Sequence, residues 1–194
     1  MQFHKTCRFA AILALVAGML IGYSVTSDAA YADVDGYSGS RWRTPTLCVQ
    51  NQIRNSTIRQ ASYDAIVHIR NNTNVHIVNK GSSSCSSYAN VVYFRDGYYS
   101  GAFTGRYLHN GHTWGQTKSG TWTYFNNSGA VLQFNTRYKN SAYNWRHIAA
   151  HEIGHALGLD HRDGYCLSVM ATGCAWKDRM QTIDIRTVNT IYGW

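Results

Sequence analysis

Three histidines and a glutamate stand close together in residues 151–161, which read HEIGHALGLDH. In an α-helix four residues advance roughly 400°, so His151 and His155 would lie on one face, where both imidazoles can bind one metal ion. Gly158 suits the end of that helix, because the residue after a helix often has a positive φ. The chain can then turn back and bring His161 to the same ion. Three protein ligands leave a fourth position for water, which is typical of a catalytic zinc.

Glu152 follows the first of these histidines and is the only glutamate in the chain. From that position its carboxylate can reach a water on the ion without being a ligand itself. Zinc lowers the pKa of a bound water, and a nearby carboxylate can take that water's proton and pass it to a leaving group. The stretch therefore predicts a zinc hydrolase with Glu152 as its general base. The alternative is a plain helix with surface histidines and a helix-favouring glutamate.

The elements that must position these residues are predicted from hydrophobic spacing. It indicates helices at 56–71, 145–157 and 182–192, and strands at 46–51, 74–79, 90–95, 101–108, 121–125 and 131–136. Ser56 and Thr182 are the expected N-caps, and the fuller apolar run at 90–95 favours a central strand. We therefore expect one α/β (α+β) domain, in which a twisted mixed sheet of about five strands carries an active-site helix and a C-terminal helix.

The N-terminal part has the pattern of an exported protein. A basic start precedes an apolar run over residues 9–21, and small residues follow in the pattern A-x-A. These features predict a secretory signal peptide over residues 1–32 and a secreted, extracellular protein; the alternative is an uncleaved anchor. The Gly- and Ser-rich residues 33–45 are expected to form a flexible arm. Residues 46–194 would then form the catalytic domain, which is long enough to bury a core.

Four cysteines follow the predicted signal peptide. An even number in an exported chain indicates two disulfides, for which three pairings are possible. We expect the local pair Cys166–Cys174, which leaves Cys48–Cys85. A cysteine-ligated metal is the alternative, but no C-x-x-C spacing is present.

The chain is basic, with a formal net charge of +8. Such a surface would adhere to anionic polymers, including those of a cell wall. The basic residues are scattered, without a run or a nucleic-acid-binding motif, so we expect no specific nucleic-acid partner. The acidic residues are too few and too scattered to indicate a calcium site. His109 and His112 suggest a second metal site, but no acidic residue lies beside them, which favours loop histidines.

Two further motifs carry a resemblance to a known clan. The pattern of residues 151–161 together with Ser168-Val169-Met170 resembles the zinc motif and Met-turn of the metzincin metalloendopeptidases. The ending at 182–193 is similar to the last helix of matrixin catalytic domains. The resemblance implies a metzincin-type zincin domain in which His151, His155 and His161 bind one Zn²⁺ above an apolar floor made by Met170.

The resemblance also implies where substrate binds. A peptide would lie extended along an edge strand, for which residues 101–108 are the candidate. The wall of the pocket after the scissile bond would come from the segment around Ala171 to Trp176, and an apolar or aromatic side chain would enter it.

Within the clan, the small size and the cysteines around the Met-turn are similar to snapalysin, a small secreted bacterial protease. Two positions depart from that pattern. Snapalysins have Asp as the third ligand, whereas this chain has His161, with Asp163 as a second candidate. The tyrosine that snapalysin places two residues after the ligand is replaced by Asp163, and Tyr165 is the nearest tyrosine, which makes it a candidate pocket residue.

These features together predict a secreted, monomeric zinc metalloendopeptidase that acts on protein or peptide substrates through a zinc-bound water and a glutamate general base. Two other functions remain open. A zinc-dependent peptidoglycan amidase or peptidase would use every residue in the same role. A non-enzymatic protein that binds cell-surface polymer would hold a structural zinc, which the open fourth position and Glu152 argue against.

Overall fold

The computed structural model describes residues 40–109, 116–119, 122–125, 130–174 and 176–193. The predicted signal peptide, most of the predicted arm and His112 lie outside these ranges. Within them, no helix is both long enough and apolar enough to cross a membrane.

A five-stranded sheet forms the base of the domain, in the order β3-β2-β4-β8-β5. Its strands are β2 (Thr46–Asn51), β3 (His76–Asn79), β4 (Val91–Gly97), β5 (Gly105–His109) and β8 (Ala130–Asn135). Strands β3, β2, β4 and β8 pair in parallel, whereas β5 runs antiparallel to β8 and forms one edge. The expected mixed sheet is confirmed, and β4 is its central strand, as its apolar run indicates.

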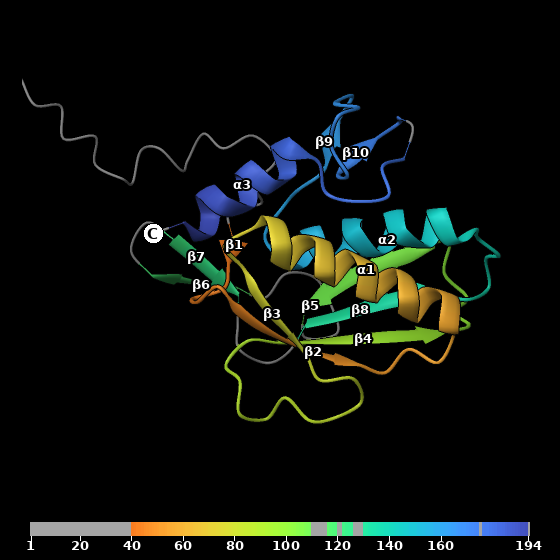
Figure 1. Ribbon diagram of the computed structural model, residues 1–194, viewed down its shortest axis with the longest axis horizontal. Coiled ribbons are helices and arrows are strands. Elements are labelled where there is room, and N and C mark those ends of the chain that lie inside the picture. The colour runs from red at the N-terminus through yellow and green to blue at the C-terminus, as the bar shows by residue number, and fades with distance from the viewer. Residues whose placement is uncertain (1–39, 110–115, 120–121, 126–129, 175, 194) are drawn as a thin grey trace, which may run out of the picture.

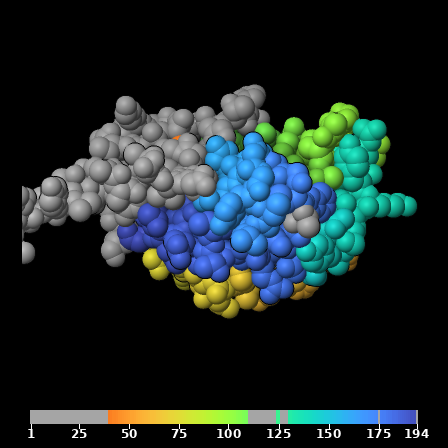
Figure 2. Space-filling model, turned by 90° about the horizontal axis from the view of Figure 1, so that it is seen from above, coloured from red at the N-terminus to blue at the C-terminus, as the bar shows by residue number. Residues whose placement is uncertain are grey.

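Helices α1 (Ser56–Asn72) and α2 (Ala142–Ala156) lie side by side on one face of this sheet (Figure 1). Helix α3 (Thr182–Tyr192) lies above them, and the view from above shows the C-terminal third of the chain in blue, with α1 in yellow along its lower edge (Figure 2). The helices and the inner side of the sheet enclose the core. Its largest buried side chains include Trp42, Phe94 and Phe134.

The helix starts differ slightly from the prediction. Asn55, not Ser56, caps α1, because its side-chain oxygen accepts the N–H of Ile58 at 3.1 Å. Helix α2 begins at Ala142, three residues before Trp145, because Ser141 caps it. Helix α3 begins at Thr182 as expected, but its cap is the preceding glutamine. Hydrophobic spacing cannot detect these starts, since the capping residues are polar and act through hydrogen bonds at the helix ends.

A second, three-stranded sheet has the order β1-β7-β6, made of β1 (Ser40–Arg41), β7 (Trp122–Phe125) and β6 (Gln116–Ser119). The strand expected at 121–125 therefore belongs to this sheet and not to the main one. Strand β1 also corrects part of the expected flexible arm, because Ser40 and Arg41 are buried and pair with β7.

The arm ends in a buried tryptophan. Trp42 is 1% exposed, and its indole Nε1 donates to the carbonyl of Ala156, the last residue of α2, at 2.7 Å. Its backbone N–H donates to the hydroxyl of Tyr192, and Arg41 Nη1 donates to the carbonyl of Ile191. Residues 40–42 are thus docked against the ends of α2 and α3, residues 43–45 lead from there into β2, and residues 33–39 lie outside the described ranges.

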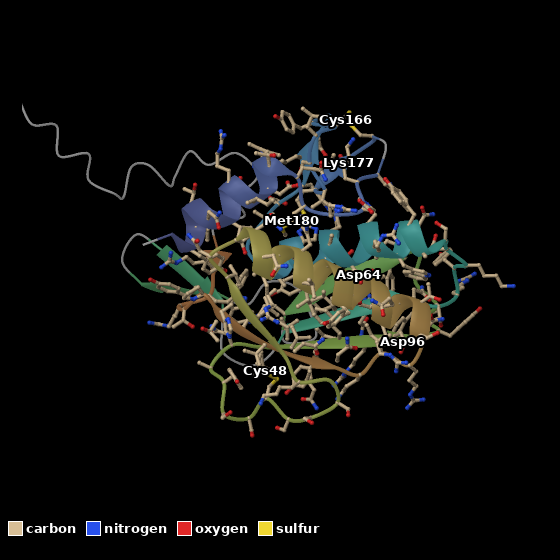
Figure 3. The ribbon with its side chains drawn as sticks, viewed as in Figure 1. Cys48, Asp64, Asp96, Cys166, Lys177 and Met180 are labelled. Atoms are coloured by element: carbon tan, nitrogen blue, oxygen red, sulfur yellow. A yellow bond between two sulfur atoms is a disulfide. The ribbon has the colours of Figure 1, made fainter. Side chains whose placement is uncertain are left out.

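Two disulfides join Cys48 to Cys85 and Cys166 to Cys174. The first lies below the sheet, where it ties the loop at 80–90 to β2, and the second lies at the opposite side of the molecule (Figure 3). Both are the pairs expected from the sequence. The Cys166–Cys174 loop contains the short strand β10 (Ala171–Thr172). This strand pairs with another short strand, β9 (Arg162–Asp163), which lies just before the loop.

Candidate active site

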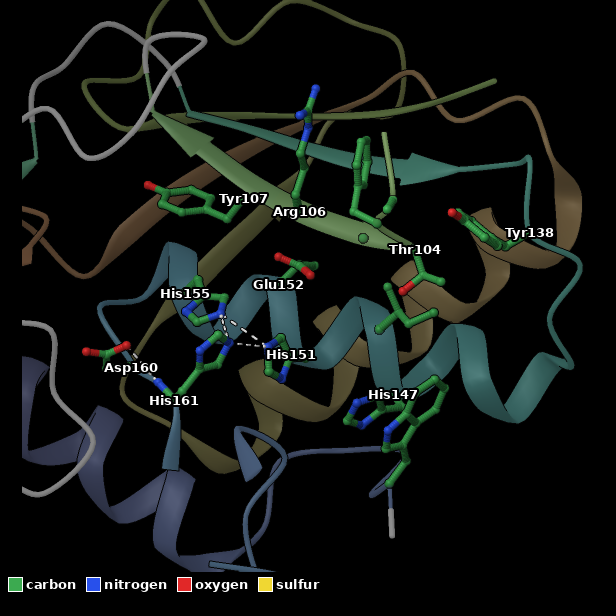
Figure 4. Close-up of a pocket in the computed structure, with 15 residues that line it drawn as sticks. Thr104, Arg106, Tyr107, Tyr138, His147, His151, Glu152, His155, Asp160 and His161 are labelled. Atoms are coloured by element: carbon green, nitrogen blue, oxygen red, sulfur yellow. Dashed lines mark hydrogen bonds between the residues drawn. The ribbon is translucent and has the colours of Figure 1, made fainter. Parts of the chain in front are cut away.

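The three histidines of the motif point their Nε2 atoms at one another (Figure 4). Each of the three Nε2–Nε2 distances among His151, His155 and His161 is 3.2 Å. The first two residues lie one turn apart on α2, as the spacing predicts. Gly158, with φ +95°, reverses the chain after α2, and this positive φ lets His161 return to the same point.

The backbone orients two of these rings. Nδ1 of His151 lies 3.0 Å from the carbonyl of Val169, and Nδ1 of His155 lies 2.9 Å from the carbonyl of Leu159. A carbonyl only accepts hydrogen bonds, so each Nδ1 must carry the proton and each Nε2 must present its lone pair. Burial lowers the pKa of His151 to about 3 and that of His155 to about 4, which keeps both rings neutral.

This donor set fits a zinc ion. A tetrahedral zinc with Zn–N distances of about 2.0–2.1 Å holds its nitrogen ligands about 3.3–3.4 Å apart, close to the spacing of the three Nε2 atoms. Lone pairs of neutral rings that face each other repel, and a cation between them removes that repulsion. Histidine ligands whose other nitrogen donates to a carbonyl are typical of zinc sites.

The Met-turn lies beneath this helix. Met170 is fully buried, and a Cβ at Gly154 would lie 2.5 Å from its Sδ, so the thioether packs directly on the backbone of α2. Asp184, buried near the start of α3, accepts hydrogen bonds from the Ser168 hydroxyl and from the backbone N–H of Val169. The turn is therefore held between α2 and α3.

Glu152 is buried between α2 and the edge strand β5 (Figure 4). Burial raises the pKa of its carboxyl to about 8, and a hydrogen bond from the Tyr107 backbone acts in the opposite direction. Gly105 permits this close approach, because a Cβ there would lie 2.4 Å from Cγ2 of Ile148 and 2.9 Å from Oε1 of Glu152. The sequence gives no local signal for Gly105, since its role depends on a helix more than forty residues later in the chain.

A cleft of about 670 Å³ lies over the three histidines and Glu152. Residues 102–107, which include the first half of β5, form one rim, so the expected rim at 101–108 lies against the site. Strand β5 pairs with β8 on one side only within the main sheet, and it can offer its other edge to an extended peptide.

The opposite wall contains a histidine that the motif does not include. His147 lies one turn before His151 on α2, and its ring stacks on Trp176 with centroids 4.7 Å apart and an interplanar angle of 12°. Its Nδ1 lies 2.9 Å from the carbonyl of Lys177, and the Tyr143 hydroxyl donates to the carbonyl of Trp176 at 2.6 Å. These two hydrogen bonds from α2 fix the position of residues 176–177. His147 was not predicted from the sequence. Its position four residues before His151, on the same face of the helix, is the feature that could have indicated it.

Of the three predicted pocket residues, Trp176 lines the cleft, whereas Ala171 and Tyr165 do not. Ala171 is 9% exposed and belongs to β10, and Tyr165 borders a separate hollow beside α3. None of residues 171–174 lines the cleft, which the spacing of the residues does not reveal.

The two remaining metal candidates lie elsewhere. Asp163 is exposed and accepts a hydrogen bond from the Thr172 hydroxyl, and it is not part of the histidine group. His109 was expected in a loop, but it is the last residue of β5. Its ring is buried between those of Trp42 and Phe125, at centroid distances of 5.7 and 5.5 Å.

Comparison with known proteins gives a family match and several structural neighbours. The family model described as Matrixin matches residues 48–193. A crystal structure of myroilysin is similar with a TM-score of 0.49 and 12% identity, covering 83% of this chain and 93% of that one. Archaemetzincin from Archaeoglobus fulgidus, complexed with malonate, is similar with a TM-score of 0.41 and 15% identity, covering 73% and 99%. No sequence among the curated proteins matches this chain.

Proposed function

This chain belongs to the matrixin family of zinc metalloendopeptidases, and from that premise we propose that it is a secreted endopeptidase with Glu152 as its general base. The observation that carries the proposal is the triangle of three Nε2 atoms with the buried carboxylate of Glu152 facing the same cleft. His151, His155 and His161 would hold the metal. When bound, zinc lowers the pKa of water to about 7 and polarises a carbonyl.

The protein's own groups would supply the remaining steps. The edge of β5 that does not pair with β8 binds the peptide backbone, which sets the scissile carbonyl over the histidines. A carboxylate oxygen of Glu152 accepts the proton of the attacking water and then delivers it to the nitrogen of the leaving amine. The hydrogen bond from the Tyr107 backbone to the carboxyl and the absence of a side chain at Gly105 keep Glu152 at the rim of the cleft.

The wall of the cleft made by His147 and Trp176 suits a flat apolar side chain of the substrate. Stacked rings present a rigid surface, and Trp176 is 41% exposed in its present position. We therefore expect protein or peptide substrates with an aromatic or apolar residue at this wall. The site is complete within one chain, which supports a monomeric enzyme.

Secretion is supported by two independent features. The sequence predicts a signal peptide over residues 1–32, and the structure contains two disulfides, which persist in oxidising compartments. The zinc-dependent amidase or peptidase of peptidoglycan remains the second candidate, since the same residues would cleave its amide bonds.

Digestion of casein beside purified cell wall tests the proposal. We expect casein fragments, no release of cell-wall peptides, complete loss of activity with a chelator, and recovery on addition of zinc. Release of cell-wall peptides without casein fragments would support the amidase. Full activity of a metal-free preparation would remove both candidates.

A further inference from the structure

The outer face of the main sheet, opposite α1 and α2, carries a row of arginines and glutamines. Arg95 of β4 lies opposite Gln133 of β8, and Gln133 lies opposite Arg106 of β5. Gln52, just after β2, extends the row at the side of Arg95. Both arginines are exposed, and Figure 4 shows Arg106 pointing away from the histidines of the cleft.

Each guanidinium is held in place without being neutralised. Nε of Arg95 donates to the amide oxygen of Gln52 at 2.9 Å, and Nε of Arg106 donates to the amide oxygen of Gln133 at 2.7 Å. An aromatic ring supports each group as well. Arg95 lies 5.4 Å from the ring centroid of Tyr93, and Arg106 lies 4.1 Å from that of Phe103. No hydrogen bond joins the terminal nitrogens of either group to a described residue, so these are the nitrogens that a ligand would contact.

No carboxylate among the described residues pairs with either arginine. The neighbouring acid is Asp96, on the other side of β4, and its two oxygens accept the backbone N–H groups of Arg54 and Asn55 at 2.8 Å each. By contrast, Arg146 on α2 is paired with Asp178 at 3.3 Å. The row therefore presents positive charge that no described carboxylate balances.

We propose that this row, Gln52–Arg95–Gln133–Arg106, binds a linear phosphate-bearing polymer. Arginine forks that are already oriented bind phosphate oxygens in pairs and lose little side-chain freedom in doing so. Strands lie about 4.8 Å apart, so Arg95 and Arg106, two strands apart, are separated by about 10 Å. Arg95 is bonded to Gln52, on the side of β4 that faces away from β5, so a polymer that crosses the strands can contact the two guanidinium groups with successive phosphates.

Binding by the row does not depend on the peptidase activity, but the position of the row gives the binding a use that rests on the proposed function. Arg106 belongs to β5, and it lies in the rim of the cleft together with the residues before and after it. A protein bound to a polymer through this row would hold its cleft beside that polymer. Proteins embedded in the same material would then be at a high local concentration.

The probe is immobilised poly(glycerol phosphate), and the measurement is the dissociation constant at several salt concentrations. Arg95→Gln and Arg106→Gln are each expected to weaken binding about tenfold, because each removes one set of hydrogen bonds to a charged group. The slope of log K against log salt should fall by about one for each arginine removed. Arg95→Lys keeps the positive charge but loses the paired donors of the guanidinium group. Its dissociation constant should therefore lie between those of the wild type and of Arg95→Gln.

The matched control is the double variant Arg59→Gln/Arg70→Gln. Both residues are exposed on α1, which covers the opposite face of the sheet, and the variant loses the same charge as Arg95→Gln/Arg106→Gln. The control should bind within about twofold of the wild type, because charges more than a Debye length from the polymer are largely screened. Arg95→Gln should also leave peptide hydrolysis unchanged, so the binding result stands whether or not the protein cleaves casein.

Several outcomes would overturn the proposal. One is a double variant at Arg95 and Arg106 that binds like the wild type. Another is a control that loses as much affinity, which would mean that the net charge and not the row is responsible. Tighter, Arg95-dependent binding of duplex DNA would assign the row to a different polymer. Equal binding of polyglutamate would refute the preference for phosphate.

Discussion

The carboxylate of Asp184 accepts the backbone N–H of Val169 at 2.8 Å, and this contact joins α3 to the metal centre. The carbonyl of Val169 lies 3.0 Å from Nδ1 of His151. One residue of the Met-turn is thus fixed by α3 on one side and orients a metal ligand on the other. Helix α3 therefore influences the site although it contributes no residue to the cleft.

Asp184→Asn is expected to weaken zinc binding and to destabilise the protein. The carboxylate accepts from the Ser168 hydroxyl and from the N–H groups of Val169 and Gln181, and an amide nitrogen cannot replace its second oxygen. Zinc affinity should fall roughly 10–100-fold, as it does when partners of metal ligands are removed. Urea unfolding of the metal-free protein should show a loss of about 1.5–3 kcal/mol.

Asp64→Asn is the control for this change, because its carboxylate accepts a hydrogen bond from Gln60 on the surface of α1. Its unfolding free energy should change by less than about 0.5 kcal/mol and its zinc affinity not at all. Unaltered zinc affinity in Asp184→Asn would show that the Val169 carbonyl keeps its place without Asp184.

Glu152→Gln should separate catalysis from metal binding. The amide has the size of the carboxylate but cannot accept a proton, so zinc content should persist while kcat falls by roughly 10²–10⁴-fold. His161→Ala should instead lower zinc occupancy, because it removes one of the three converging nitrogens. Metal content and turnover are measured on the same two purified variants.

Each of these variants has an outcome that contradicts its assignment. Near-normal turnover of Glu152→Gln would end the general-base role. Full zinc content and activity in His161→Ala would mean that Asp163 acts as the third ligand, although its carboxylate accepts the Thr172 hydroxyl and lies outside the histidine group.

Gly105→Ala is expected to reduce kcat while zinc binding is retained. The new Cβ would lie too close to Ile148 and Glu152, so either β5 or the Glu152 side chain must move. A displacement of about 1 Å at a catalytic group can cost on the order of 10²-fold in rate. Ser100→Ala, at an exposed position before β5, is the control and should keep the wild-type rate. Wild-type kinetics in Gly105→Ala would show that the strand shifts without consequence for Glu152.

Loss of one disulfide should mainly reduce stability, and loss of the other should mainly reduce activity. Cys48–Cys85 spans 37 residues and Cys166–Cys174 spans 8, so loop entropy assigns about 4 kcal/mol of stability to the first and about 2.5 kcal/mol to the second. Alanine double variants at each pair are compared by urea unfolding and by peptide hydrolysis. We expect the larger loss of stability at Cys48–Cys85 and the larger loss of activity at Cys166–Cys174, whose segment contains Met170. The reverse order for activity would contradict a role of the short loop in supporting the site.

The stability of the metal-free protein should depend on pH through buried groups of opposite sign. Glu152 has a folded pKa of about 8, raised from 4.5, so it favours the folded state below pH 4.5 and this contribution is lost as the pH rises toward 8. His151 and His155 have folded pKa values of about 3 and 4, lowered from 6.5, so their contribution is present above pH 6.5 and is lost on acidification.

Just above pH 6.5 the two histidines of the unfolded chain are still losing protons, and their contribution opposes that of Glu152, so the Glu152 contribution dominates only between about pH 7 and 8. The unfolding free energy of chelator-treated protein should therefore fall between pH 7 and 8, by less than about 1.4 kcal/mol per pH unit. Glu152→Gln should remove that slope, and urea unfolding across this range measures it. A slope that persists in the variant would place its origin in another group.

The sequence predicts best where the partners are close in the chain. The i, i+4 spacing of His151 and His155 and the reversal at Gly158 depend on one helix, and both were predicted. The role of Asp184 could not be predicted, because its partner Val169 becomes a neighbour only when α3 packs on the Met-turn. The same holds for Gly105, which contacts a helix distant in sequence.

Within the expected flexible arm, the prediction was wrong for residues 40–42, for a related reason. The Gly- and Ser-rich composition of residues 33–45 indicates a flexible segment. Trp42 is nevertheless buried, because it bonds to Ala156 and Tyr192, which are 114 and 150 residues further along the chain. Tertiary contacts of this length leave no local pattern. The pocket residues Ala171 and Tyr165 were misplaced because the path of an irregular loop cannot be derived from residue spacing.

The docking of Trp42 also bears on when the domain can finish folding. Its backbone bonds to Tyr192, and the neighbouring Arg41 bonds to Ile191, so the first described residues wait for nearly the last ones to be synthesised. Contacts of such long separation close slowly, since the chain must lose loop entropy before they form. In a newly made chain the docking of Trp42 therefore cannot be completed before residue 192 has been synthesised, which makes it a late step of folding.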